Sequence, residues 1–169
     1  MNLNVADRGR FIASFRYVEV SMMETAAAWI PTTAEMEVKV LFGRHLSEYA
    51  HHADALGKRA FELRLPLHHT LAPAQPYVIL LQDLRGLERT AERVGALYDG
   101  VVAGLERRYR GYLERTDALL DAPSVTVLER ILAELSRQRR EADGLSRELG
   151  LSRSGEAFAQ REGQSEFLA

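Results

Sequence analysis

The sequence predicts an all-α protein folded as an antiparallel four-helix bundle. Its five prolines fall at three places, at Pro31, between Pro66 and Pro76, and at Pro123, and they leave four long proline-free segments. Because proline is excluded from helix interiors, these breaks are expected to separate helices. Apolar residues within the segments recur every three or four positions, which is the period of an α-helix and not of a strand.

The first two segments run from Asp7 to Ile30 and from Ala34 to Leu65. The first has a single face with the residues Phe15, Glu19, Met22, Ala26 and Trp29. The second has a mixed apolar and polar stripe, Phe42, His45, Tyr49, His52, Leu56 and Leu63. Thr32 or Thr33 is expected to cap the second helix. The connection between the two segments is short and predicts an antiparallel hairpin.

The third segment runs from Tyr77 to Leu120 and is expected to form one long helix. Its seam is Leu80, Leu84, Leu87, Ala91, Val94, Tyr98, Val101 and Leu105. Glycines weaken this helix and indicate a kink or close helix packing, at Gly86, Gly95, Gly100, Gly104 and Gly111.

The fourth segment runs from Ser124 to Leu149, with Asp121 as its expected cap and Pro123 near its start. It forms a second hairpin with the third helix, and a longer loop from Leu65 to Gln75 joins the two hairpins. We therefore expect one bundle over residues 1–149. Residues 150–169 are polar and predict a flexible tail, in which Phe158, Phe167 and Leu168 could dock on a partner.

Composition narrows the classes of function. The 22 basic and 24 acidic residues nearly cancel, so we expect no nucleic-acid partner and no membrane-surface helix. The absence of cysteine excludes disulfides, cysteine-ligated metals and thiol catalysis. No run of about 18 apolar residues occurs, and we expect a cytoplasmic protein. The sequence also lacks a glycine-rich phosphate loop and a nucleophile elbow.

A carboxylate stands on the apolar seam of the first helix. Burying Glu19 without a partner would cost several kcal/mol, so it requires a neighbour of opposite charge or a hydrogen-bond donor. Folding the first hairpin brings it level with His45, Glu48, His51 and His52. Glu48 and His51 have the spacing with which a helix offers one carboxylate and one imidazole to a metal ion. His51 and His52 are adjacent, so at most one of them can point fully inward.

The second hairpin places Glu134 level with Glu106 and Tyr109. Glu106 shares a stripe with Val102 and Tyr109, which favours an inward position, whereas the surrounding arginines favour a solvated flank. The periodicity leaves both alternatives open.

These residues resemble the ferritin-like superfamily of di-iron and di-manganese carboxylate proteins. The resemblance covers roughly residues 10 to 145 and rests on Glu19, on Glu48 and His51, on Glu106, and on the stretch Asp121 to Pro123 at the start of the fourth helix. It implies a ferritin-like four-helix bundle. It also implies iron or manganese as cofactor, with Glu19, Glu48, His51, Glu106 and Glu134 as the ligands.

The sequence departs from the family at the fourth helix. The family repeats Glu-x-x-His there, but this chain has no histidine after His69. In one register Arg137 follows Glu134 in place of the imidazole; in the other, Leu135 and Gln138 replace both ligands. An arginine would supply a fixed positive charge and would disfavour a metal ion. A complete di-metal site is therefore not expected.

Three functions follow. In the first, the protein is a ferritin-like oxidoreductase with a reduced metal site and altered or lost oxygen activation. In the second, the metal is lost, and polar residues form a network around a small-molecule pocket or a plain core; these are Glu19, His45, Tyr49, His52, Tyr109 and Gln138. In the third, the bundle is a binding or assembly subunit, such as a homodimer. No catalytic residue is assigned.

Overall fold

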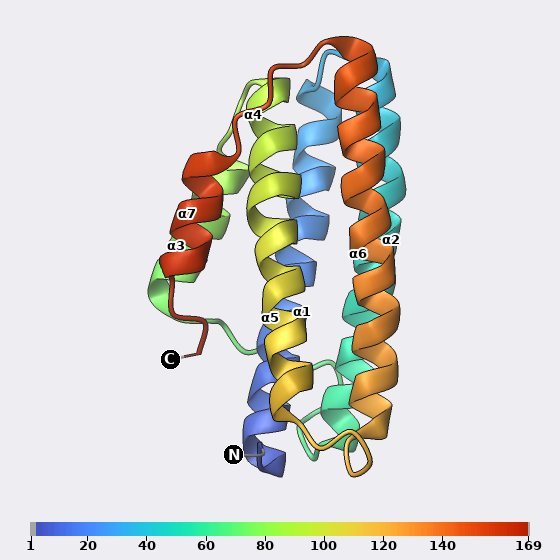
Figure 1. Ribbon diagram of the computed structural model, residues 1–169, viewed down its shortest axis with the longest axis vertical. Coiled ribbons are helices and arrows are strands. Elements are labelled where there is room, and N and C mark those ends of the chain that lie inside the picture. The colour runs from blue at the N-terminus through green and yellow to red at the C-terminus, as the bar shows by residue number, and fades with distance from the viewer. Residues whose placement is uncertain (1–2, 169) are drawn as a thin grey trace.

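The computed structural model describes residues 3–168, and every regular element in this range is helical, as the sequence predicts. Long helical rods lie side by side through most of the molecule (Figure 1). The rods are α1 (Val5–Trp29), α2 (Met36–Glu62), the continuous run of α4 (Thr90–Val94), the π-helix η2 (Gly95–Val102) and α5 (Ala103–Arg115), and α6 (Ala122–Leu149). Two shorter helices, α3 (Gln75–Arg85) and α7 (Glu156–Gln164), lie against one side, and the 3₁₀ turn η1 (Ile30–Thr32) ends α1.

The rods do not simply alternate in direction. Helices α1 and α6 run one way, while α2 and the α4–η2–α5 rod run the other way (Figure 1). Because two consecutive rods are parallel, the chain must return along the molecule between them, and α3 is part of this return. The loop expected after Leu65 is therefore the start of a crossover.

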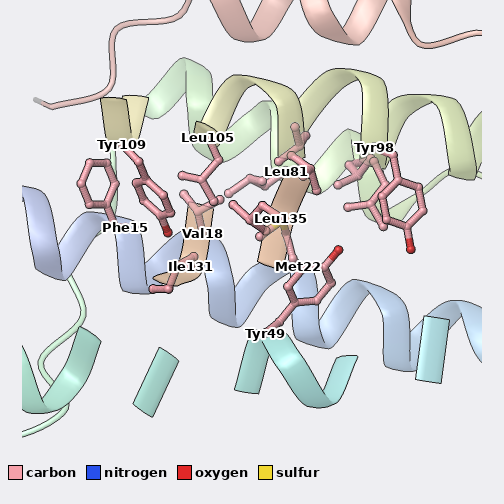
Figure 2. Close-up of a cluster of buried hydrophobic side chains, with 14 of the residues drawn as sticks. Phe15, Val18, Met22, Tyr49, Leu81, Tyr98, Leu105, Tyr109, Ile131 and Leu135 are labelled. Carbon is pink, nitrogen blue, oxygen red and sulfur yellow. The ribbon is translucent and has the colours of Figure 1, made fainter. Parts of the chain in front are cut away.

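The core is formed by apolar and aromatic side chains from all the rods. Figure 2 shows side chains of α1, α2, α3, η2, α5 and α6 meeting in a single cluster. The labelled members are Phe15, Val18, Met22, Tyr49, Leu81, Tyr98, Leu105, Tyr109, Ile131 and Leu135. Phe15 packs edge-on against Tyr109, with 4.5 Å between the ring centroids. The burial of the whole apolar and aromatic cluster is the main stabilising contribution to the fold.

The third predicted helix is wrong as a single element. It divides at residues 86–89 into α3 and the α4–η2–α5 rod, and it ends at Arg115. Trp29 lies at the break: its indole nitrogen donates to the Arg85 carbonyl over 3.1 Å, and the Arg93 guanidinium lies 5.4 Å from its ring. Gly86 follows the last residue of α3. Because glycine is a weak helix former, ending the helix here costs little free energy.

The structure also differs from the flexible tail expected after residue 150. Residues 156–164 form α7, which packs along η2. Phe167 is buried against Phe15 and Tyr77 instead of being presented to a partner. Close packing of this kind is what the glycines of the third segment were expected to indicate.

Two expected caps take other roles. Glu35, and neither threonine, precedes α2, while the Thr33 hydroxyl donates to the Trp29 carbonyl over 2.8 Å at the end of α1. Asp121 is the N-cap residue of α6, with Pro123 in the first turn, but its carboxylate binds other side chains. Over residues 3–168, no helix combines the length and the hydropathy needed to cross a membrane.

Candidate functional site

Polar side chains fill the contact between α2 and α6 in a regular series. His45 and His52 are seven residues apart on α2, and their partners Glu141 and Glu134 are seven apart on α6. Seven residues make two helical turns, so each residue type returns to the same face. Because the two helices are antiparallel, a step forward along α2 meets an equal step back along α6.

His52 is held between two carboxylates. Its Nδ1 donates to Glu19 Oε2 over 3.1 Å, and its Nε2 donates to Glu134 Oε2 over 2.8 Å. Burial by itself lowers the pKa of His52, but the charges and hydrogen bonds of the two glutamates outweigh it and raise the pKa to about 9. The imidazole is therefore a cation at neutral pH, and it neutralises the buried Glu19.

The second oxygen of Glu19 is also bound. The Tyr109 hydroxyl donates to Glu19 Oε1 over 2.7 Å, and Glu19 and Tyr109 are both fully buried. Burial and the Glu19 charge raise the pKa of Tyr109, so its hydroxyl remains a donor. Both oxygens of Glu19 thus have partners supplied by the protein.

His45 repeats the arrangement with one neutral partner. Its Nε2 donates to Glu141 Oε2 over 2.8 Å, and its Nδ1 lies 2.7 Å from the Tyr98 hydroxyl. Burial lowers the pKa of His45 in spite of the opposing effect of Glu141. A neutral ring with a proton on Nε2 leaves Nδ1 to accept from the Tyr98 hydroxyl.

Glu48 lies between these two histidine clusters and meets α6 side chains. Arg137 Nη2 donates to Glu48 Oε1 over 2.7 Å, and Gln138 Nε2 donates to Glu48 Oε2 over 2.6 Å. The Arg137 guanidinium also donates to Glu141 Oε1 over 3.0 Å. One arginine therefore bridges two carboxylates, and it stands where one of the two registers left open by the sequence would put an imidazole.

Glu106 faces inward, the first of the two alternatives that periodicity left open. It is buried, and it accepts hydrogen bonds from the Ser136 hydroxyl and from Arg139 Nη1, the latter over 2.8 Å. Its charge is compensated by Arg139 from α6, and it makes no contact with Glu134, which binds His52 and Arg130.

The structure does not bring the five residues expected as metal ligands into one group. Glu19 and Glu134 share His52, whereas Glu48 binds Arg137 and Glu106 binds Arg139. His51 is exposed. In the part of the chain that the structure describes, no three histidine, cysteine or acidic side chains converge as a metal ion requires. The residues present therefore do not fit a ferritin-like metal centre.

Two polar atoms of the expected network are buried without a hydrogen-bond partner among the described residues. The Tyr49 hydroxyl and the Oε1 atom of Gln138 are buried and make no hydrogen bond of acceptable geometry within residues 3–168. Figure 2 shows Tyr49 and Tyr98 with their hydroxyls on the same side of the apolar cluster. Hydrogen bonds thus join Glu19, His52 and Tyr109 in one network, whereas Gln138 donates to Glu48.

Sequence reasoning missed a further buried carboxylate. Asp121 accepts from Arg59 Nη2 over 2.9 Å, from the Tyr112 hydroxyl over 2.6 Å and from the Thr116 and Ser124 hydroxyls. Arg59 lies seven residues after His52, so the series His45, His52 and Arg59 on α2 was the signal that could have revealed it. The hydrogen-bonding roles of Tyr98 and Glu141 were missed as well, although Glu141 lies seven residues after Glu134 and repeats this spacing on α6.

The cavities of the described residues are small or open. A small, partly open pocket of about 110 Å³ adjoins the His52 and Glu134 pair, with the lining His51, His52, Ala55, Thr126, Val127, Arg130 and Ile131. The larger hollows, of about 430 to 610 Å³, are grooves on the surface. The buried series is therefore packed against protein and not around a ligand-sized chamber.

Comparisons with known protein families, with curated proteins and with solved structures find no significant match to this chain.

Proposed function

We propose that the protein is a metal-independent member of the ferritin-like superfamily that works as a helical scaffold for assembly. The observation that carries the proposal is the bridge of Arg137 between Glu48 and Glu141. A fixed guanidinium there supplies the positive charge that a metal ion would otherwise supply. The bound carboxylates leave no open coordination position for oxygen chemistry.

The path of the chain supports the ferritin-like part of the proposal. Ferritin-like bundles have one long crossover between their two hairpins. In this protein α1 and α2 form one hairpin, α5 and α6 form another, and the connection that contains α3 crosses between them. The bundle and its carboxylate positions are retained, while the ligand chemistry is replaced.

The buried series has a structural role in this proposal. The pairs His45 with Glu141 and His52 with Glu134 form together in one register of α2 against α6. A shift by one helical turn would leave charges buried without partners, at a cost of several kcal/mol. Polar residues of this kind select one packing among several that the apolar residues would allow.

An exposed apolar surface favours a role in assembly. Val5, Phe61, Leu67, Leu119 and Leu120, which we call the end patch, lie on segments at the same end of the molecule. Leu119 and Leu120 are 85% and 73% exposed. Large apolar side chains that are exposed together at one end of a folded protein are typical of interaction sites.

The charges beside the end patch fit a second copy of this chain. Exposed residues of both signs lie within a few sequence positions of the patch residues, namely Lys58, Glu62, Arg64, Glu114 and Arg115. An anionic lipid surface would require an excess of cations, whereas a two-fold interface places each sign opposite the other. We therefore assign the end patch to a homodimer contact.

Two experiments test the proposal. In an anaerobic Fe(II) titration the wild type is expected to bind no iron, as is Glu48→Ala; stoichiometric binding that Glu48→Ala abolishes would refute the metal-free core.

In sedimentation equilibrium, the wild type is expected to be dimeric and the double variant Leu119→Ser, Leu120→Ser monomeric. The control Val40→Ser, at an exposed valine outside the patch, should remain dimeric. A monomeric wild type, or a dimeric double variant, would refute the contact.

A further inference from the structure

Residues 151–168, which we call the C-terminal strap, approach one rod more closely than side chains allow. A Cβ atom added at Gly95 would lie 2.8 Å from the Ser154 nitrogen, and one added at Gly100 would lie 2.8 Å from the Phe158 Cβ. A Cβ at Gly104 would meet the Glu162 side chain at 2.0 Å. These three glycines therefore form the surface on which the strap lies.

The three glycines share a face only because η2 is a π-helix. In a regular α-helix each residue turns by about 100°, so Gly95 and Gly104 would point in nearly opposite directions. The i to i+5 hydrogen bonding of a π-helix adds a residue to the turn and brings positions five apart toward one side. The strap thus fits the π register of residues 95–102 and not the α register.

One buried carboxylate fixes the strap on this surface. Glu162 accepts from the Tyr77 hydroxyl over 3.2 Å, from Arg107 Nη2 over 3.0 Å and from Arg108. Arg108 also donates to the carbonyls of Glu162 and Ser165. The strap is held by charge-assisted hydrogen bonds as well as by shape.

The side of η2 that faces α2 carries the residue that contacts His45. Tyr98 lies within the π-helix, and its hydroxyl is 2.7 Å from His45 Nδ1. A change from the π to the α register would rotate the upstream half of the rod by about one residue, roughly 100°. Tyr98 would then move away from His45.

We infer that docking of the C-terminal strap holds η2 in the π register and thereby positions Tyr98 against His45. Gly95, Gly100 and Glu162 are positioning residues that act through Tyr98. A π-helix is rare, because its hydrogen bonding is less favourable than that of an α-helix, so the strap supplies the interaction that retains it. The strap and the buried histidine are coupled through this helix, independently of whether the proposed assembly role is correct.

Substitution of glycine by alanine tests the coupling. Gly95→Ala places a Cβ against backbone atoms of the strap, whereas Gly111→Ala on the same rod meets nothing within 4 Å and is the matched control. Release of the strap is measured as tryptic cleavage after Arg153. The state of His45 is measured from its ring nitrogens in a ¹H–¹⁵N correlation spectrum, with Tyr98→Phe as the reference for a lost hydrogen bond.

We expect Gly95→Ala to increase strap cleavage by about tenfold or more and to move the His45 signals to those of Tyr98→Phe. The His52 signals should stay unchanged, and Gly111→Ala should alter neither readout. If Gly95→Ala does not fold, Gly155→Ala decides, since its Cβ would meet the Gly95 carbonyl oxygen at 2.4 Å from outside the rod. A released strap with wild-type His45 signals, or a strap that stays docked in both variants, would overturn the inference.

Discussion

Glu19 and His52 form a buried ion pair between α1 and α2, with 3.1 Å between Oε2 and Nδ1. Seven residues earlier on α2, His45 meets a neutral tyrosine in the place that Glu19 takes at His52. The two imidazoles occupy equivalent positions on one helix, yet the second carboxylate makes His52 a cation while burial keeps His45 neutral.

The pair predicts a specific dependence of stability on pH. Since the pKa of His52 is raised from 6.5 to about 9, its contribution to the free energy of unfolding is complete below pH 6.5 and is lost as pH rises through 9. Urea unfolding of the wild type is expected to lose roughly 3 kcal/mol over this interval relative to His52→Gln. In Glu19→Gln the NMR titration midpoint of His52 should fall. A midpoint near 6.5 in the wild type would contradict this account.

Tyr109→Phe removes one of the donors to the buried Glu19 carboxylate. Because the carboxylate then keeps a lone pair without a partner, we expect a loss of about 1–3 kcal/mol in the free energy of unfolding, measured by urea denaturation. Tyr17→Phe, at a partly exposed tyrosine of α1, is the control and should change stability little. Equal effects of the two substitutions would show that the Tyr109 hydrogen bond contributes nothing.

Asp121→Ala should be among the most destabilising single substitutions. It leaves the buried Arg59 with Glu62 as its remaining carboxylate partner and leaves three hydroxyls without an acceptor, for which we expect a loss of about 3–5 kcal/mol in thermal or urea unfolding. Asp54→Ala breaks an exposed pair with Lys58 and serves as the control, with little expected change. A mild effect of Asp121→Ala would mean that water replaces the lost acceptor.

Helix periodicity and proline positions were enough to predict the all-α class and three of the long helices. They were enough because each of these helices carries its own apolar face, and Asp121 with Pro123 marks the start of α6 within the sequence. The division of the third helix was not predictable in this way. It depends on Trp29, more than fifty residues away, which binds the carbonyl of Arg85 at the break.

The sequence was enough to predict at which height along the bundle the residues of the candidate site lie, but not which side chains pair with one another. The hairpin geometry placed Glu19 beside α2, yet it could not decide between His51 and His52, because a rotation of α2 by one residue exchanges them. The strap was missed for a different reason. Glu162 is buried against Gly104 of α5, while the strap residues before it lie on Gly95 and Gly100 of η2. The π-helix that brings these glycines to one face is not visible in a pattern read at 3.6 residues per turn.

In the proposed function, protein cations replace a metal ion between the helices, so the metal content of the purified protein is the decisive measurement. The protein is purified without chelator and without immobilised nickel, and its iron, manganese and zinc are measured by inductively coupled plasma mass spectrometry. With Arg137 bridging Glu48 and Glu141, we predict far less than one equivalent of any metal, in the wild type and in Glu48→Ala alike. One or more equivalents in the wild type, lost in Glu48→Ala, would contradict the account and restore the oxidoreductase hypothesis.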